Sequence, residues 1–185
     1  GWSKSGAIVP EKVNGKYYMY FEDAPGGGDL FYATSEDLLT WTIKGVVMER
    51  RKGYFDQLTI EPGPTPVILE EGILLIYSSL DYQLGQGGRL TGGWVMFSRE
   101  DPTKIIARCE EPFLVPEFDW ENSGQVPNCV FAEGLLKIEN MWYLYYGAAD
   151  MRVGLARAPV RDRSVLWSTE TKAEWEDGTR DNEIS

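Results

Sequence analysis

The amino-acid sequence predicts an all-β protein that forms a partial β-propeller of about three blades. Short apolar segments alternate with strong turn signals, and helical periodicity is nearly absent. The chain also repeats itself loosely, with turns that recur roughly every 60 residues, a period typical of propeller blades. The three units begin with segments 6–23, 63–79 and 128–150, which continue into further strands over 29–41, 92–102 and 152–160.

Each unit contains a hairpin turn, at Asn14-Gly15, Glu71-Gly72 or Glu139-Asn140. Asn-Gly between two apolar runs is a strong hairpin signal. The strand after each turn is almost continuously apolar: YYMYF (17–21), ILLIY (73–77) and WYLYY (142–146). Runs of this kind are typical of strands buried on both faces, so we expect all three to lie inside the stack of blades.

Three blades do not close a ring, because known propellers use about four to eight. A blade buries its faces only by stacking on its neighbours, so we expect this arc to be completed by missing N-terminal blades or by another copy. The predicted blades cover about 1–50, 51–118 and 119–160, and a polar tail, 161–185, follows with one closing strand around 165–169. The competing architecture is a β-sandwich, which also contains many short strands.

Composition narrows the classes of function. The 185 residues carry a net charge of -11, which argues against nucleic acid or an anionic membrane surface as a partner. No apolar run approaches the roughly 18 residues of a membrane span. The chain has no His, which excludes Ser-His-Asp chemistry and His-ligated metals. Aromatic residues make up 13%, and Tyr and Trp suit the faces of sugars, although a β-rich core explains most of them.

The sequence contains no recognisable cofactor- or metal-binding motif. Cys109 and Cys129 match neither a metal-ligand spacing nor a redox motif, so we expect reduced packing residues, with a disulfide as the alternative. The glycine-rich stretches 26–28 and 85–88 lack the strand-glycine-helix context of a phosphate loop. The sequence shows no signal peptide and leaves the compartment open.

Several stretches carry a resemblance to a known family. They are SGAIVPEKVNGKYYMYF (5–21), TSEDLLTW (34–41), EPGPTPV (61–67), DPTKIIAR (101–108), PFLVPEFDWENSGQVPNCVFAEG (112–134) and WYLYYGAAD (142–150). Together they resemble glycoside hydrolase family 130, five-bladed propellers that cleave β-mannosides by phosphorolysis or hydrolysis. The run from Pro112 to Asp150 is the most specific. The resemblance implies that 1–50 is the third blade and that the general acid, an aspartate, lies outside this chain.

The resemblance also separates phosphorolysis from hydrolysis. Phosphate-using members carry a Lys, a His and an Arg at the positions of Thr59, Ser78 and Glu22. An incoming phosphate dianion needs such cations, and acidic side chains would repel it. We therefore expect an inverting, hydrolytic glycosidase acting on β-mannosides or mannose-containing oligosaccharides. The alternatives are a non-catalytic carbohydrate-binding propeller or inactive fragment, a mannoside phosphorylase, and a furanosidase or arabinanase-type propeller.

An inverting hydrolase needs a carboxylate that takes a proton from water. Glu22 and Glu61 are the candidates, because each lies where a strand meets a loop in one of two adjacent blades. The resemblance supports glutamates at the former phosphate site. The alternative for Glu22 is a solvated loop acid, whereas Pro62 and Pro64 rigidify the turn at Glu61.

Asp150 ends the apolar run YYGAAD, and the resemblance implies that it hydrogen-bonds sugar hydroxyls at the mouth of the central channel. The alternative is a turn residue paired with Arg152. The other expected substrate-binding residues are Tyr146, Arg108, Asn128, Glu121 and Tyr82. For these, the alternatives are core packing for Tyr146, an ion pair of Arg108 with Glu110 or Glu121, and turn formation for Asn128 and Glu121. Three blade edges also favour association with further copies.

Overall fold

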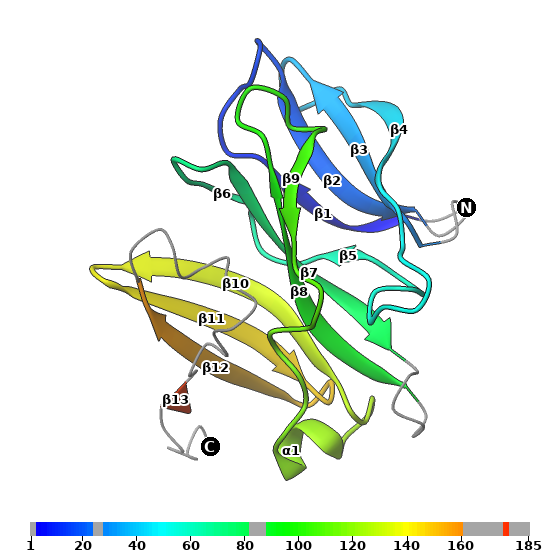
Figure 1. Ribbon diagram of the computed structural model, residues 1–185, viewed down its shortest axis with the longest axis vertical. Coiled ribbons are helices and arrows are strands. Elements are labelled where there is room, and N and C mark those ends of the chain that lie inside the picture. The colour runs from blue at the N-terminus through cyan, green and yellow to red at the C-terminus, as the bar shows by residue number, and fades with distance from the viewer. Residues whose placement is uncertain (1–2, 24–27, 82–87, 161–175, 178–185) are drawn as a thin grey trace.

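The computed structural model describes residues 3–23, 28–81, 88–160 and 176–177. In this part of the chain three antiparallel sheets follow one another in sequence and stack face to face (Figure 1). The second sheet lies in the middle, between the first and the third. This arrangement is the one that the repeat predicts, because each sheet pairs its own consecutive strands and packs against the next unit along the chain.

The first sheet is a meander of four strands. They are β1 (Ser3–Ile8), β2 (Tyr17–Asp23), β3 (Leu30–Ser35) and β4 (Thr42–Met48). The predicted turn between β1 and β2 is present: Asn14 and Gly15 have φ of 52° and 81°, and Val13 and Lys16 bond to each other across it. Two central residues with positive φ are what a tight hairpin turn requires, and Asn-Gly adopts them readily.

The second sheet has an interrupted first strand. Its strands are β5 (Glu61–Pro62), β6 (Val67–Ile68), β7 (Ile73–Asp81), β8 (Arg89–Phe97) and β9 (Ile105–Arg108). Both β5 and β6 pair with β7, and the Pro-rich segment between them breaks the ladder because proline has no N–H to donate. The interruption leaves Glu61 as the first residue of a two-residue strand.

The third sheet comprises β10 (Val130–Ile138), β11 (Met141–Ala148), β12 (Arg152–Pro159) and β13 (Glu176–Asp177), and the helix α1 (Asp119–Asn122) precedes it. The strand β13 lies in the polar tail and pairs with β12. The segment 165–169, around which the sequence predicts a closing strand, lies outside the described residues.

Two apolar cores separate the sheets. One contains Tyr20 and Leu30 of the first sheet with Leu75 and Phe97 of the second. The other joins Ile76 of the second sheet to β10 and β11. The strand β7 therefore alternates between two cores, which explains its uninterrupted apolar run and near-complete burial.

The expectation of two buried faces holds for β7 and is wrong for β11. Leu144 and Tyr146 of β11 are buried, whereas Tyr145 between them is 40% exposed. In the described part of the chain the third sheet has a neighbour on one face only, so its strands alternate between buried and exposed side chains. Cys109 and Cys129 are buried and free, as packing residues. The only helix in the described residues is far too short to cross a membrane.

Candidate active site

Two carboxylates from neighbouring sheets meet around one ammonium. Glu22 lies near the end of β2 and Glu61 at the start of β5, and their exposed fractions are 3% and 8%. Lys4 of β1 pairs with Glu22 across the first sheet, and its Nζ lies 2.7 Å from Glu61 Oε1 and 3.7 Å from Glu22 Oε2. The structure therefore brings together the two glutamates that the sequence predicts as catalytic, and it adds a lysine.

The two carboxylates are bound differently. Glu61 accepts a hydrogen bond from Lys4 and a longer one, 3.4 Å, from the Ser5 hydroxyl. Glu22 Oε2 is buried without a hydrogen bond, because 3.7 Å from an ammonium is an ion pair but too long for such a bond. Burial and the charge of Glu61 raise the pKa of Glu22, and the opposing effect of Lys4 is smaller. Glu22 is thus the carboxylate that holds a proton more readily than an ordinary glutamate.

Lys4 remains charged despite partial burial. Burial lowers its pKa, but the hydrogen bond and charge of Glu61, together with Glu22, outweigh that effect and raise the pKa overall. Its side chain is 43% exposed, while both acids are covered. The cluster consequently carries two acids and one base, with a net negative charge whenever both acids are ionised.

Asp150 occupies the turn between β11 and β12. Ala149 and Asp150 both have positive φ, 49° and 53°, and the Asp150 side chain is exposed. No ion pair joins it to Arg152, although the structure describes both residues. Burial raises the pKa of Cys129 to about 11, with the charges of Asp150 and Glu61 adding to the effect. The charges of Asp150 and Glu61, which come from two neighbouring sheets, therefore both act on the same thiol.

Tyr146 and Glu121 bind each other. The Tyr146 hydroxyl donates to Glu121 Oε1 at 2.6 Å, and Glu121 Oε2 accepts from the backbone N–H groups of Glu117 and Phe118. Both residues are buried, and Trp120 stacks on the Tyr146 ring. This hydrogen bonding fits a role in holding α1 and its loop against β11 better than direct contact with a sugar.

Arg108 forms an ion pair with Asp56, a carboxylate that was not among its predicted partners. Its Nη2 lies 2.6 Å from Oδ2 of Asp56, which is fully buried, and its Nη1 donates to the Glu49 carbonyl. Asp56 also binds Arg51 and accepts from the Tyr77 hydroxyl. The alternative of an ion pair for Arg108 is therefore present, but the proposed partners, Glu110 and Glu121, are wrong, because the segment before β5 brings Asp56 within reach.

Asn128 and Tyr82 are the last two predicted residues. Asn128 has a positive φ of 56°, and its carbonyl accepts from the Leu90 N–H, so its backbone serves the connection before β10. Tyr82 lies outside the described residues. No group of three side chains suited to a metal gathers in the described part of the chain.

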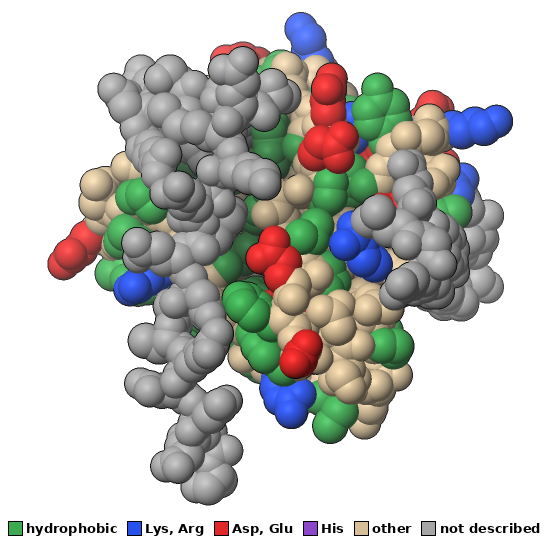
Figure 2. Space-filling model, turned by 60° about the horizontal axis from the view of Figure 1, so that its bottom comes forward, with side chains coloured by type: hydrophobic (Ala, Val, Ile, Leu, Met, Phe, Trp, Pro, Cys, Tyr) green, Lys and Arg blue, Asp and Glu red, His purple; other side chains and the backbone are tan. Residues whose placement is uncertain are grey.

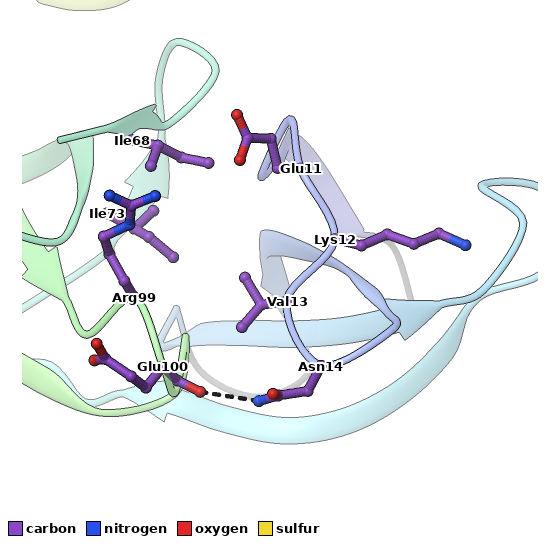
Figure 3. Close-up of a pocket in the computed structure, with 8 residues that line it drawn as sticks. All are labelled: Glu11, Lys12, Val13, Asn14, Ile68, Ile73, Arg99 and Glu100. Carbon is purple, nitrogen blue, oxygen red and sulfur yellow. Dashed lines mark hydrogen bonds between the residues drawn. The ribbon is translucent and has the colours of Figure 1, made fainter. Parts of the chain in front are cut away.

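The site is formed where β2 ends and β5 begins. Figure 2 turns the end of the molecule that carries α1 towards the viewer and shows acidic side chains set among hydrophobic ones in the middle of this face. A cavity of about 270 Å³ lies elsewhere, at the hairpin turns of the first two sheets. Figure 3 shows it between Val13, Asn14, Ile68 and Arg99. The turn at Asn14 precedes β2 and Glu22 lies near the other end of that strand, so this cavity is at the opposite end of the strands from the site.

Sequence reasoning missed Lys4. The residue sits in no motif, and its partner Glu61 is distant in the sequence, so pattern alone gave no sign of the pairing. The nearest signal in the sequence was the stretch 5–21 that resembles the family, which begins one residue after Lys4.

The chain forms three stacked antiparallel sheets with acids at their strand ends. Its architecture is that of a five-bladed β-propeller, of which the chain forms about three blades. A family model described as beta-1,4-mannooligosaccharide phosphorylase matches residues 1–166. The chain therefore belongs to glycoside hydrolase family 130, whose members are enzymes that act on glycosides.

Two curated relatives come from Thermoanaerobacter sp. (strain X514). The chain is 37% identical to its beta-1,2-mannobiose phosphorylase, covering 83% of this chain and 49% of that protein. It is 34% identical to its 1,2-beta-oligomannan phosphorylase, covering 86% and 52%. The chain thus spans about half the length of the curated relatives it matches.

A solved structure is similar as well. Its description states that the GH130 family of mannoside phosphorylases contains glycoside hydrolases. These hydrolases target beta-1,2 mannosidic linkages in Candida mannan. It is 34% identical, with a TM-score of 0.77, over 84% of this chain and 48% of that one. The relatives therefore include proteins named for each of the two reactions.

Proposed function

We propose that the complete protein hydrolyses β-mannosides with inversion at the anomeric carbon. The observation that carries this proposal is the cluster of Glu22 and Glu61 around Lys4, in which two buried acids outnumber one cation. A phosphate dianion entering this cluster would meet net negative charge, whereas a water molecule would meet a carboxylate able to accept its proton.

Glu22 is the better placed of the two acids to act as the base. Its Oε2 has no hydrogen bond, while both oxygens of Glu61 face donors. In the proposed step Glu22 takes a proton from water as the water oxygen bonds to the anomeric carbon. The glycosidic C–O bond breaks, and its oxygen receives a proton from a general acid. The family resemblance assigns that acid to the part of the relatives that this chain does not span.

Asp150 is the proposed sugar-binding residue. It is exposed, its charge acts on the Cys129 thiol as that of Glu61 does, and a carboxylate can accept hydrogen bonds from two hydroxyl groups of one pyranose. The names of the relatives point to mannosides, with beta-1,2 linkages in three of the four curated relatives.

Phosphorolysis is the second candidate, and two observations favour it. All four curated relatives are named phosphorylases, so by name they support phosphorolysis more strongly than hydrolysis. Lys4 also supplies one cation to the cluster and is partly exposed. Against this, Lys4 already binds Glu61, so a phosphate would have to compete for the Lys4 ammonium with a carboxylate of the protein itself.

The experiment is an assay of the full-length protein on β-1,2- and β-1,4-mannobiose, with and without inorganic phosphate. Hydrolysis yields mannose in both conditions, whereas product that forms only with phosphate, as mannose 1-phosphate, identifies a phosphorylase. Binding without any product would support a non-catalytic role.

Variants then test the residues. Glu22→Gln is expected to lower kcat by about 10²- to 10⁴-fold, the usual contribution of a general base. The control is Glu36→Gln, which changes an exposed acid in a turn of the first sheet. Unchanged turnover of Glu22→Gln would remove Glu22 from the mechanism.

A further inference from the structure

The first strand of the chain is distorted where it meets the site. Its register against β2 shifts between Lys4 and Ala7, and Ser5 has a positive φ of 59°. A residue other than glycine adopts this left-handed conformation at a cost of about 1 kcal/mol or more. Bulges of this kind re-aim side chains, and they are frequent beside active sites.

The distortion has a direct result. In a regular strand Lys4 and Ser5 would point to opposite faces of the sheet. Here the Lys4 ammonium donates to Glu61 Oε1 and the Ser5 hydroxyl donates to Glu61 Oε2. Two consecutive residues of the first sheet thus bind both oxygens of one carboxylate in the second sheet.

We propose that Lys4 is a positioning residue that binds and orients the Glu61 side chain and leaves Glu22 as the acid that exchanges protons with water. This inference rests on the proposed hydrolytic function and deepens it. The geometry carries it: Lys4 bonds to Glu61, lies 3.7 Å from Glu22, and is the cation between the two sheets.

Among the described residues, Glu61 and Lys4 are the charged groups that act on Glu22. Ser5 of β1 donates to Glu61, and the charges of Glu61 and Asp150 act on the thiol of Cys129 before β10. On the adjoining strands, Leu30 of β3 lies opposite Glu22 and Ser78 of β7 lies opposite Glu61. The nearest charges along the same strands are Asp23 after Glu22 and Asp81 towards the end of β7. Lys4 is therefore the group that opposes burial and the charge of Glu61 in setting the pKa of Glu22.

The test measures the pH dependence of kcat/KM in the full-length protein. In Lys4→Met the two carboxylates face each other without a cation, so the acidic limb of the profile is expected to move upward by about one pH unit. Lys4→Arg should restore the limb, because it returns the positive charge. Lys4→Gln serves as a second neutral variant if Lys4→Met does not fold.

The matched control is Lys12→Met, which removes a lysine at the opposite end of the strands, beside the cavity in Figure 3. An acidic limb that stays in place in both neutral variants would overturn the proposal, even if activity falls, because a purely structural role lowers activity without moving the limb.

A second readout separates this proposal from the proposed function. The protonation of Glu22 is followed by NMR of carboxyl-labelled glutamate, without substrate. An upward shift in Lys4→Met supports the role of Lys4 even if the wild-type protein proves to need phosphate. No shift overturns that role even if the wild-type protein hydrolyses mannobiose.

Discussion

At the scale of single residues, Glu22 holds its negative charge in an unfavourable place. Burial and the charge of Glu61 raise its pKa, so the folded protein binds this proton more tightly than the unfolded chain does. Ionised Glu22 therefore lowers the free energy of unfolding at neutral pH. This cost decreases as the pH falls through the raised pKa, and it is absent below the ordinary glutamate value of 4.5.

The substitution Glu22→Gln is accordingly expected to raise the melting temperature at pH 7. The gain should shrink on acidification and vanish below about pH 4.5, where the wild-type residue is neutral as well. Thermal unfolding of both proteins between pH 4 and 8 measures it. A lower melting temperature for Glu22→Gln at pH 7 would mean that the attraction of Lys4 outweighs burial.

Individual residues also show where sequence reasoning reached its limit. Glu22 and Glu61 were identifiable because each acid lies where a strand meets a loop and because the family resemblance places glutamates at the former phosphate site. The structure brings both to one place. Lys4 was not identifiable, because it reaches Glu61 from a bulged strand and no local pattern in SKSGAI predicts that bulge. For Arg108, the sequence indicated an acidic partner but not Asp56, since pairing across many residues depends on how loops return to the sheet.

At the scale of elements, the hairpins were predictable and the interruptions were not. The turns at Asn14-Gly15 and at Glu139 form with positive φ as expected, because short-range backbone preferences decide them. The split between β5 and β6 follows from prolines that were visible, yet its consequence, a two-residue strand presenting Glu61, depends on pairing with β7. Burial of β11 on one face alone is a property of the stack and not of the strand.

The connection from β4 to β5 is the element that delivers Glu61, and Asp56 anchors it. Asp56 is fully buried between Arg51 and Arg108, so removing its carboxylate leaves two guanidinium groups without their partner. Asp56→Ala is expected to lower the free energy of unfolding by about 3–5 kcal/mol, which urea denaturation measures.

A control lies nearby on the same face. Asp29 pairs with Arg50 at 2.8 Å, but both side chains are partly exposed, at 18% and 33%. Asp29→Ala should therefore cost no more than about 1 kcal/mol. Equal losses in the two variants would show that burial does not distinguish these ion pairs.

At the scale of the whole molecule, the three sheets bury unequal amounts of apolar surface. The middle sheet contributes to two cores, while the third sheet contributes to one. Its other face carries Leu136 opposite Tyr143, Gly147 opposite Val153, and Tyr145, and the exposed fractions of Leu136, Tyr145 and Val153 are 52%, 40% and 78%. Arg157 lies opposite Tyr143 on the same face, so a cation is set among these apolar side chains. An exposed sheet face rich in apolar side chains is typical of an interface.

This exposed face leads to a prediction for residues 1–185 expressed alone. Apolar association through the third sheet competes with repulsion from a net charge of -11. At physiological salt, charges more than about 8 Å apart are largely screened, so burial of the apolar face should prevail and the chain should associate as its concentration rises. Size-exclusion chromatography with light scattering measures the mass of the species.

Two variants decide whether the third sheet is responsible. Leu136→Asp with Val153→Asp places charges on the face and should return the chain to a monomer. Leu39→Asp changes an equally apolar and more exposed side chain, but in a turn of the first sheet, and should leave association unchanged. A chain that stays monomeric at every concentration would contradict the prediction. So would association that Leu39→Asp abolishes and the double variant does not, because the interface would then lie on the first sheet.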